Sequence, residues 1–322
     1  MPFSADNQEA GNCPLVSVVI PAYNRAGSIR TSVDSVLRQT YRPIEVIVVD
    51  DGSTDGTSET LRHYGDRILV VRKINGGPSA ARNSGVAVAK GEIVAFLDSD
   101  DTWEPTKLER QVRLMVLGGQ NIACCICNAL NIVDGIPAQT SFEIAGIDCG
   151  LEEGYWLNPS ELIATRFLLF NQVVAIRKEA FIQVGGFKEE MRLLEDHDLA
   201  FRLSLLGSWA FVRKPLVSKF DMADGIGVTA RLDPFAHATA WAGTLRGFLE
   251  EPLAGKVVRH WIVVALREVE LEIKAVKMGL KGGAFFGLLS RTLMLGLRYK
   301  GAIRRRSPGW PKAKAVEALA PR

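Results

Sequence analysis

Three carboxylates lie within four residues at Asp98-Ser99-Asp100-Asp101, directly after the apolar run Ile93 to Leu97. Carboxylates this close repel one another unless a cation lies beside them. A hard divalent ion such as Mg²⁺ or Mn²⁺ prefers oxygen ligands and commonly joins one or two carboxylates to substrate phosphates. Such an ion acts as a Lewis acid on a departing diphosphate. The alternative is a solvated acidic loop in which Asp101 caps the following helix.

Two further polar segments follow apolar runs or precede a helix. Asp50-Asp51-Gly52-Ser53 comes after the run 44–49, and a carboxylate there can accept a hydrogen bond from a nucleobase N–H. Gly76-Gly77 precedes a helix-like segment that contains Arg82. A helix N-terminus beside a guanidinium is suited to binding phosphate. Taken one at a time, both segments are also explained as ordinary glycine-containing turns.

The rest of this region alternates between strand-like and helix-like patterns. Helical patterns begin near residues 28, 57, 79, 104, 178 and 195. Strand-like apolar runs occupy 15–21, 44–49, 68–71, 93–97, 122–126, 173–176 and 209–217. This alternation predicts an α/β fold with a parallel sheet, in which ligands bind beyond the carboxyl ends of the strands. Both acidic clusters fall at such ends, and the loose pattern over 136–170 predicts loops around a second substrate.

The 322-residue chain has the composition of a globular protein, with 47% hydrophobic and 23% charged residues. Three of its five cysteines, Cys124, Cys125 and Cys127, lie in an apolar run, where thiols usually act as small buried hydrophobes. We therefore expect these cysteines to form neither a zinc site nor a disulfide. Free thiols fit a reducing compartment. The polar first 14 residues lack the apolar region of a signal peptide.

Charge is distributed unevenly along the chain. Residues 256–322 contain 15 lysines and arginines and four acidic residues. The remainder of the chain contains 24 lysines and arginines and 32 acidic residues. A tail this basic indicates an anionic partner. Residues 256–281 fit a long helix, and 284–297 are apolar but too few and too charged for a membrane span. The tail is expected either to lie on an anionic membrane surface or to pack on the catalytic domain or a twin subunit.

The motifs are most informative as an ordered series. They run from Val18-Val19-Ile20-Pro21-Ala22-Tyr23-Asn24 through Val48 to Asp55, Ala80-Ala81-Arg82-Asn83, Phe96 to Asp101 and Gly185-Gly186-Phe187 to Glu195-Asp196-His197-Asp198. This series closely resembles the family 2 glycosyltransferases of GT-A fold, from residue 15 to residue 220. The resemblance implies a Rossmann-like, mostly parallel sheet flanked by helices. It also implies a metal-dependent, inverting transfer of a sugar from a nucleotide-diphosphate donor, taken to be UDP-linked, to a hydroxyl of a glycan or lipid-linked acceptor, as in cell-surface polysaccharide synthesis.

The resemblance implies roles for individual residues on the nucleotide side. Asp51 matches the acid that meets the uracil ring, and Arg82 matches an arginine near the nucleotide and diphosphate. Asp100 and Asp101 are the implied contacts of a Mn²⁺ or Mg²⁺ ion. The implied nucleotide-sugar contacts are Pro21, Ala22, Tyr23, Asp50, Asp51, Arg82, Asp98, Ser99 and Asp100.

On the acceptor side, the resemblance makes Asp196 the general base. An inverting transfer needs a carboxylate to take the proton of the acceptor hydroxyl as its oxygen attacks the anomeric carbon. Glu195 is expected to support this base or position the acceptor, and Arg202 to orient the pair. The simpler explanation of Asp196 is an acid stabilised by the helix dipole. The segment 217–222 departs from many relatives because it lacks a histidine near the metal.

We expect a disordered N-terminus (1–14), a GT-A domain (15–228), a helical C-terminal extension (229–306) that contacts the membrane or packs on protein, and a flexible tail (307–322). The protein is expected to be cytoplasmic and peripheral on the membrane, with a homodimer left open and no nucleic-acid partner. A sugar-phosphate nucleotidyltransferase is an alternative, although Pro21 to Arg25 lacks its glycine- and arginine-rich phosphate loop. The other alternative is a non-catalytic nucleotide-sugar-binding scaffold, which the intact acids disfavour.

Overall fold

The computed structural model describes residues 13–166, 168–221 and 234–277. A single sheet of ten strands runs through it, in the order β3-β2-β1-β4-β9-β6-β10-β5, with β7 paired to β6 and β8 paired to β10. The strands are β1 (Val16–Ala22), β2 (Ile44–Asp50), β3 (Leu69–Arg72), β4 (Ile93–Phe96), β5 (Thr102–Trp103), β6 (Ile122–Val133), β7 (Ile136–Thr140), β8 (Glu153–Trp156), β9 (Val174–Arg177) and β10 (Ser208–Asp221).

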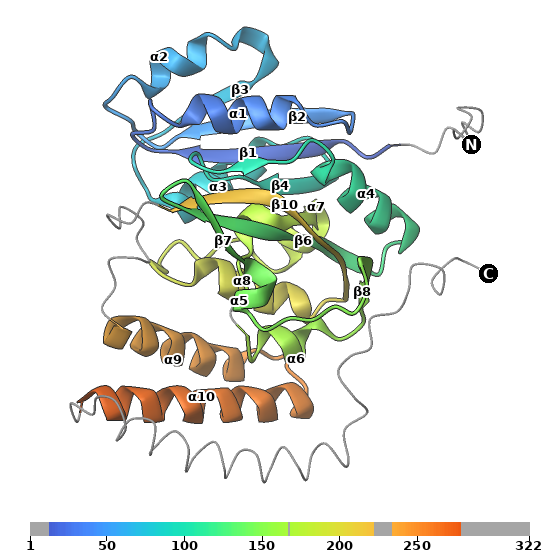
Figure 1. Cartoon of the computed structure of the whole chain (residues 1–322), viewed down its shortest axis with the longest axis vertical. Helices are drawn as coiled ribbons and strands as arrows, with labels where there is room; N and C mark the ends of the chain where they lie inside the picture. The colour runs from blue at the N-terminus through green and yellow to red at the C-terminus, as the bar shows by residue number, and fades with distance from the viewer. Residues whose placement is uncertain (1–12, 167, 222–233, 278–322) are drawn as a thin grey trace.

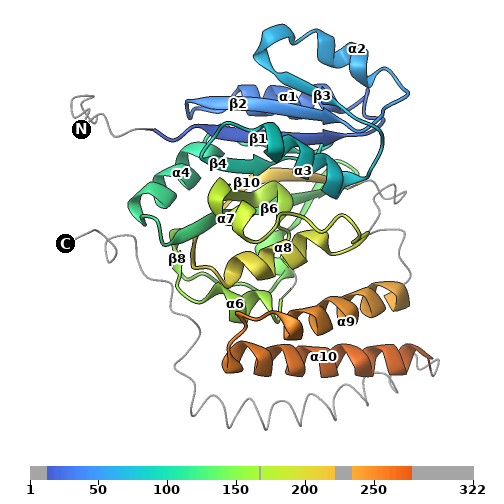
Figure 2. The same ribbon diagram turned by 180° about the vertical axis from the view of Figure 1, so that it is seen from behind.

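Helices cover both faces of this sheet (Figures 1 and 2). The α-helices are α1 (Ile29–Leu37), α2 (Thr57–Arg62), α3 (Pro78–Val88), α4 (Lys107–Leu117), α5 (Ser141–Ile144), α6 (Pro159–Ile163), α7 (Lys178–Gln183), α8 (Glu195–Ser204), α9 (Pro234–Glu250) and α10 (Lys256–Lys277). Two short 3₁₀ turns are η1 (Gly65–Arg67) and η2 (Asn171–Val173). The predicted α/β class is therefore confirmed.

The N-terminal half of the sheet is parallel, as the sequence predicts. Strand β1 pairs in parallel with both β2 and β4, and β2 pairs in parallel with β3. Strands β1 and β4 are short apolar runs whose residues are buried on both faces, because helices lie on either side. Helix α3 packs so closely on β1 that a Cβ at Gly85 would lie 2.4 Å from a methyl carbon of Val19. Because β1, β2, β3 and β4 run in the same direction, their carboxyl ends lie at the same edge of the sheet.

The second half of the sheet is mixed. Strand β9 lies between β4 and β6 and is antiparallel to both. Strands β6 and β10 pair in parallel along most of their length. The expected cysteine strand is β6, and Cys124, Cys125 and Cys127 are fully buried in it as free thiols, as predicted. The segment 136–170 differs from the expectation of loops alone, because β7, α5, β8 and α6 form within it and pair or pack with neighbouring elements.

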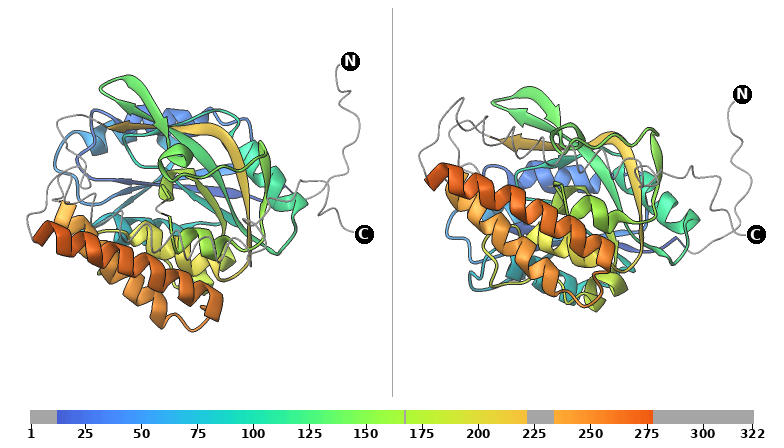
Figure 3. Two further views of the ribbon diagram at one scale, coloured as in Figure 1. Left: turned by 60° about the horizontal axis from the view of Figure 1, so that its bottom comes forward. Right: turned by 90° about the horizontal axis from the view of Figure 1, so that it is seen from below.

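The helices α9 and α10 lie side by side below the sheet (Figure 3). Helix α9 contacts α8 and helix α10 contacts α6, so the described part of the extension packs on the α/β domain. Phe201 of α8 stacks on Phe248 of α9 with ring centroids 3.9 Å apart, and His197 meets Trp241 at 4.5 Å. None of the helices in the described ranges is long and apolar enough to cross a bilayer. The expected domain edge near 228, the N-terminal segment up to residue 12, the apolar run 284–297 and the tail lie outside the described residues.

Candidate functional site

The predicted nucleotide segment lies where β1 and β2 end together. The parallel register places Ala22 beside Asp50, and the Asp51 amide donates to the Ala22 carbonyl oxygen at 2.8 Å. The next residue, Tyr23, is 47% exposed, whereas Ala22 is buried. The exposed ring of Tyr23 is therefore the part of Pro21-Ala22-Tyr23 that is open to a planar ligand.

The carboxylate of Asp51 joins the end of β2 to the glycine turn before α3. It accepts hydrogen bonds from the amides of Gly76 and Gly77, at 3.0 and 2.8 Å, and from the Lys73 ammonium at 2.8 Å. Gly77 has φ +88°, a conformation that glycine adopts without steric cost. Asp51 is buried, so it fixes this turn to the edge of the sheet where the nucleobase of a donor would lie.

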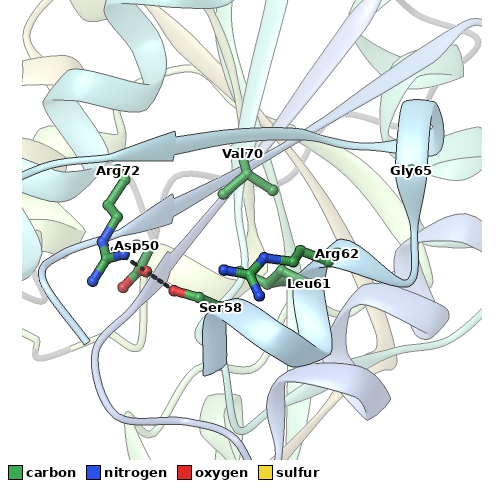
Figure 4. Close-up of a pocket in the computed structure, with 7 residues that line it drawn as sticks. All are labelled: Asp50, Ser58, Leu61, Arg62, Gly65, Val70 and Arg72. Carbon is green, nitrogen blue, oxygen red and sulfur yellow. Dashed lines mark hydrogen bonds and ion pairs between the residues drawn. The ribbon is translucent and has the colours of Figure 1, made fainter. Parts of the chain in front are cut away.

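Asp50 contacts different elements from Asp51. It accepts hydrogen bonds from the Ser53 amide at 2.8 Å and the Ser58 hydroxyl at 2.7 Å, with Arg72 at 3.7 Å. Burial alone would raise the pKa of Asp50, but the bonds from Ser53 and Ser58 outweigh it and lower the pKa. Its carboxylate faces a shallow pocket of about 240 Å³ between α2 and β3 (Figure 4). The contacts of Asp50 therefore fit a loop-forming residue better than the implied nucleotide contact.

Both oxygens of Asp98 are held by protein groups. Arg82 Nη2 donates to Oδ1 at 2.7 Å, and the side-chain amide of Gln172 donates to Oδ2. Arg82 is buried on α3, where its Cζ lies 5.4 Å from the Phe187 ring centroid. The neighbouring residue Ser99 is also buried. Asp98 is therefore part of an ion pair, and protein donors fill one acceptor position on each of its oxygens.

Asp100 and Asp101 differ in how open they are. The Asp100 side chain is 47% exposed, with its Oδ2 3.6 Å from Arg25 Nε. Asp101 is buried, and its Oδ1 accepts a hydrogen bond from the Phe220 amide at 3.0 Å. Burial and the neighbouring Asp98 charge raise the pKa of both carboxyls. Two acids whose pKa is raised by lost hydration and by a like charge are the kind of oxygen ligands that a divalent cation would stabilise.

The donor set fits a metal held partly by its substrate. In the described part of the chain, no group of three or more His, Cys, Asp or Glu side chains is arranged so that it could hold a metal ion by itself. Magnesium-like ions are commonly bound through one or two carboxylates together with substrate phosphates. Asp100, the exposed member of the cluster, is the residue best placed for that role. Asp101 is placed to fix the end of β10 against the cluster.

Arg82 joins the aspartate cluster to the Glu-Asp pair. Its Nη1 donates to Glu195 Oε1 at 3.3 Å, while its Nη2 donates to Asp98. Glu195 and Asp196 open α8, directly after Leu194, which has φ +62° and is buried. The left-handed backbone conformation is uncommon for residues other than glycine. It costs about 1–3 kcal/mol of strain, and such strain is often retained at functional sites.

Asp196 has the pKa expected of a general base. Its side chain is half-buried at the start of α8. Burial and the adjacent charge of Glu195 raise the pKa of Asp196 to about 7, whereas Arg82 acts to lower it. A base with a pKa near working pH has an effective compromise between protonation state and basicity.

Arg202 has a different role from the one expected. Its guanidinium donates to Asp198 at 2.8 and 2.6 Å and to the carbonyl oxygens of Val184 and Gly186, with the Gly186 bond at 2.8 Å. It therefore holds α8 to the 184–186 turn, and the arginine that contacts the Glu-Asp pair is Arg82. Sequence spacing favoured Arg202 because it is close in sequence, whereas Arg82 is 113 residues away from Glu195.

Sequence reasoning did not single out Asn171, Gln172 or Arg25. Gln172 contacts Asp98, and Asn171 faces Arg82, with its amide oxygen 3.2 and 3.3 Å from the guanidinium nitrogens when that oxygen is turned toward them. The antiparallel pairing of β4 and β9 brings this segment to the site. Strand direction could not be read from the apolar run 173–176.

The fold and the site together define a class: an α/β protein with a carboxylate cluster and a raised-pKa acid at the carboxyl edge of a parallel half-sheet. The model of the glycosyl transferase family 2 matches residues 17–189, more than half of the chain. A glycosyltransferase of Rickettsia prowazekii is 31% identical over 251 residues, covering 74% of each chain. The chain therefore belongs to glycosyl transferase family 2.

A second relative and two solved structures extend the comparison. Hyaluronan synthase of Pasteurella multocida is 31% identical over 213 residues, 65% of this chain but 21% of the synthase. The structure of Staphylococcus aureus TarS 1–349 in complex with UDP-GlcNAc matches with a TM-score of 0.64 and 19% identity, covering 85% of this chain and 79% of that one. The mannosyltransferase PcManGT of Pyrobaculum calidifontis, in complex with GDP-Man and Mn²⁺, matches with a TM-score of 0.55 and 19% identity, covering 88% and 81%. These structural likenesses show the GT-A fold.

Proposed function

We propose that this glycosyltransferase is a metal-dependent, inverting enzyme. It moves a sugar from a UDP-linked donor to a hydroxyl of a glycan or lipid-linked acceptor, as in cell-surface polysaccharide synthesis. The observation that carries the proposal is the Arg82 bridge, with Nη2 2.7 Å from Asp98 and Nη1 3.3 Å from Glu195. It places the acid of raised pKa, Asp196, beside the aspartate cluster.

Asp196 is the general base in this mechanism. Its carboxylate takes the proton of the acceptor hydroxyl, and that oxygen attacks the anomeric carbon on the side opposite the diphosphate. The new glycosidic bond forms as the bond to the diphosphate breaks, which inverts the anomeric configuration. Burial and the charge of Glu195 keep the pKa of Asp196 high, and Arg82 holds Glu195 in place.

Asp100 and Asp101 form the proposed metal site, with Asp100 as the open ligand. A bound Mn²⁺ or Mg²⁺ ion would supply Lewis-acid stabilisation of the departing diphosphate. Asp98 and Arg82 hold the inner side of this cluster. The exposed Tyr23 is the proposed surface for the nucleobase, beside the glycine turn that the buried Asp51 holds and on which the proposed contact of Asp51 with the nucleobase depends. The Mn²⁺ complex of PcManGT and the UDP-GlcNAc complex of TarS support the metal and the diphosphate-sugar donor.

We further propose that the basic C-terminal region meets an anionic membrane at the cytoplasmic face. The excess of lysine and arginine after residue 256 supports this. Sedimentation with vesicles of phosphatidylglycerol and phosphatidylcholine tests it. Binding that rises with the anionic fraction and falls with salt is expected, and equal binding to neutral vesicles contradicts it.

Thermal unfolding with a panel of nucleotide sugars tests the proposed donor class. We expect UDP and UDP-sugars to raise the melting temperature in the presence of Mn²⁺, because a ligand that binds only the folded state stabilises it by mass action. Mn²⁺ without nucleotide is expected to have a smaller effect. If no nucleotide diphosphate raises the melting temperature, with or without metal, the proposed function is wrong.

A further inference from the structure

The 3₁₀ turn η2 (Asn171–Val173) is placed opposite the aspartate cluster by the register of two strands. Strand β9 continues from η2 and pairs antiparallel with β4, with Ala95 opposite Ala175. Directly before β9, η2 contacts β4. Its residue Gln172 therefore reaches Asp98, which follows the end of β4, and the two side chains are hydrogen-bonded.

Two side chains of η2 hold the ion pair between Arg82 and Asp98. The Gln172 amide nitrogen donates to Asp98 Oδ2 while Arg82 occupies Oδ1. The Asn171 amide oxygen, turned toward the guanidinium, lies 3.2 and 3.3 Å from its two terminal nitrogens. Each partner of the ion pair is therefore held by a neighbouring amide. All four residues come from three segments that are distant in sequence.

The backbone of η2 is anchored in the core by buried polar groups. Trp103 Nε1 donates to the Gln172 carbonyl oxygen at 3.0 Å, and Gln111 Nε2 donates to the Val173 carbonyl oxygen at 2.7 Å. Lys107 Nζ donates to Gln111 Oε1 at 2.8 Å and lies 3.8 Å from the Trp103 ring centroid. Burying a lysine is costly, and the fully buried Lys107 braces the two side chains that hold η2.

We propose that Gln172 is a positioning residue for sugar transfer. An aspartate carboxylate turns readily about its last torsion, and donors on both oxygens fix that torsion. Gln172 thus holds Asp98 toward Arg82, and Arg82 in turn stays on Glu195 beside Asp196. The inference rests on the proposed function. It makes Gln172, which lies outside the Asp98–Asp101 cluster and the Glu195-Asp196 pair, the residue that keeps the two connected.

The test uses Gln172→Glu in the full chain. The introduced carboxyl repels Asp98 when it is ionised, whereas its protonated form has an O–H that can donate to Asp98 Oδ2 in place of the amide. The repulsion raises the pKa of the introduced carboxyl. The rate of UDP release from UDP-GlcNAc, or from whichever UDP-sugar the wild type hydrolyses fastest with water as the acceptor, is measured from pH 5.5 to 9. The ratio of variant to wild-type kcat is expected to fall by roughly 10-fold from the acidic to the alkaline end.

Two amide deletions separate positioning from stability. Gln172→Met removes the hydrogen bond at similar length. Gln39→Met is the matched control, because Gln39 is also buried and its amide bonds the backbone of Glu104 and Leu108, without a bond to Asp98, Arg82 or the Glu-Asp pair. Both variants are expected to melt earlier than wild type. Only Gln172→Met is expected to lower kcat, by roughly 10-fold, with a smaller change in KM.

The outcomes are distinct. A wild type that turns over no UDP-sugar contradicts the proposed function itself. An active wild type with a pH-independent ratio for Gln172→Glu, or with equal kcat losses for Gln172→Met and Gln39→Met, overturns the positioning role. If the Gln172 variants do not fold, Trp103→Phe takes their place: it keeps a ring beside Lys107, removes the donor to Gln172, and must lower kcat more than Gln39→Met does.

Discussion

The guanidinium of Arg82 reaches Glu195 at 3.3 Å across 113 residues of sequence. The same guanidinium is paired with Asp98 at 2.7 Å. One buried arginine of α3 therefore connects the acids at the end of β4 with those that open α8. Because Glu195 raises the pKa of Asp196, this contact ties the state of the proposed base to the geometry of the aspartate cluster.

Arg82→Lys is expected to lower kcat/KM by about 10²-fold, because an ammonium group cannot span two carboxylates as the planar guanidinium does. The charge is kept, so the loss reports geometry. Arg177→Lys is the control: Arg177 donates to the carbonyl oxygens of Ile122, Met115 and Gly119, away from the site. Steady-state kinetics of UDP release compares the two. Equal losses in both variants would show that Arg82 matters only for folding.

Glu195→Gln is expected to shift the pH profile of kcat/KM. Activity of the wild type should rise with pH through an apparent pKa of about 7, as Asp196 loses its proton. Removing the Glu195 charge takes away one cause of the raised pKa. The acidic limb of the profile should therefore move to lower pH. An unchanged limb, measured with the same sugar donor, would mean that another group sets the profile.

Asp196→Asn should make the protein more stable at alkaline pH. The carboxyl has a folded-state pKa of about 7 against an ordinary value of 3.8, so the folded state binds its proton more tightly than the unfolded state does. The wild type therefore loses stability as pH rises from about 4 to 7, and the penalty is constant above 7. Asparagine has no such penalty. Chemical denaturation should show that the variant is more stable than the wild type by a larger margin at pH 8 than at pH 5. The kcat of the variant should be about 10² to 10⁴-fold lower, because the proposed base is lost.

The two acids of the proposed metal site should respond differently to substitution. Asp100→Asn is expected to weaken Mn²⁺ binding in the presence of UDP by roughly 10-fold or more, since the exposed carboxylate is lost. Asp101→Asn keeps an oxygen that accepts from the Phe220 amide, so its effect on Mn²⁺ should be smaller. Titration followed by electron paramagnetic resonance of Mn²⁺ measures both. Stronger loss in Asp101→Asn would reassign the principal ligand.

The aromatic contact between α8 and α9 predicts that the helical extension supports the site. Phe248→Ala removes the ring that stacks on Phe201 and should lower the free energy of unfolding by about 3–5 kcal/mol. Leu253→Ala, at a residue that is 65% exposed on the same hairpin, should change it by no more than about 0.5 kcal/mol. Urea denaturation gives both values. Similar values for the two variants would mean that α9 contributes little to the core.

The parallel half of the fold and the residues at its strand ends were predictable from the sequence. Buried apolar runs and the polar residues that follow them are local signals, and parallel pairing then brings Asp51 and Asp98 to one edge. The family series also marked Asp196. The contact of its neighbour Glu195 with Arg82 is long-range in sequence, and spacing alone does not supply it.

The remaining parts depend on interactions between distant segments. The run 173–176 has the same apolar pattern whichever way the strand points, so neither the antiparallel β9 nor the contact of Gln172 with Asp98 could be inferred. Asp50 was grouped with its neighbour Asp51, yet the two carboxylates contact different loops. Arg202 was assigned by closeness in sequence to Asp196, although a competing acid, Asp198, takes its guanidinium.

The proposed base and metal site are tested most directly by UDP release from a panel of UDP-sugars by the wild type, Asp196→Asn and Asp100→Ala, with Mn²⁺ present and after chelation. We expect release by the wild type with Mn²⁺, loss of that release on chelation, and loss in both variants, which still fold and melt cooperatively. Release that persists in both Asp196→Asn and Asp100→Ala would contradict the assignment of the base and the metal site.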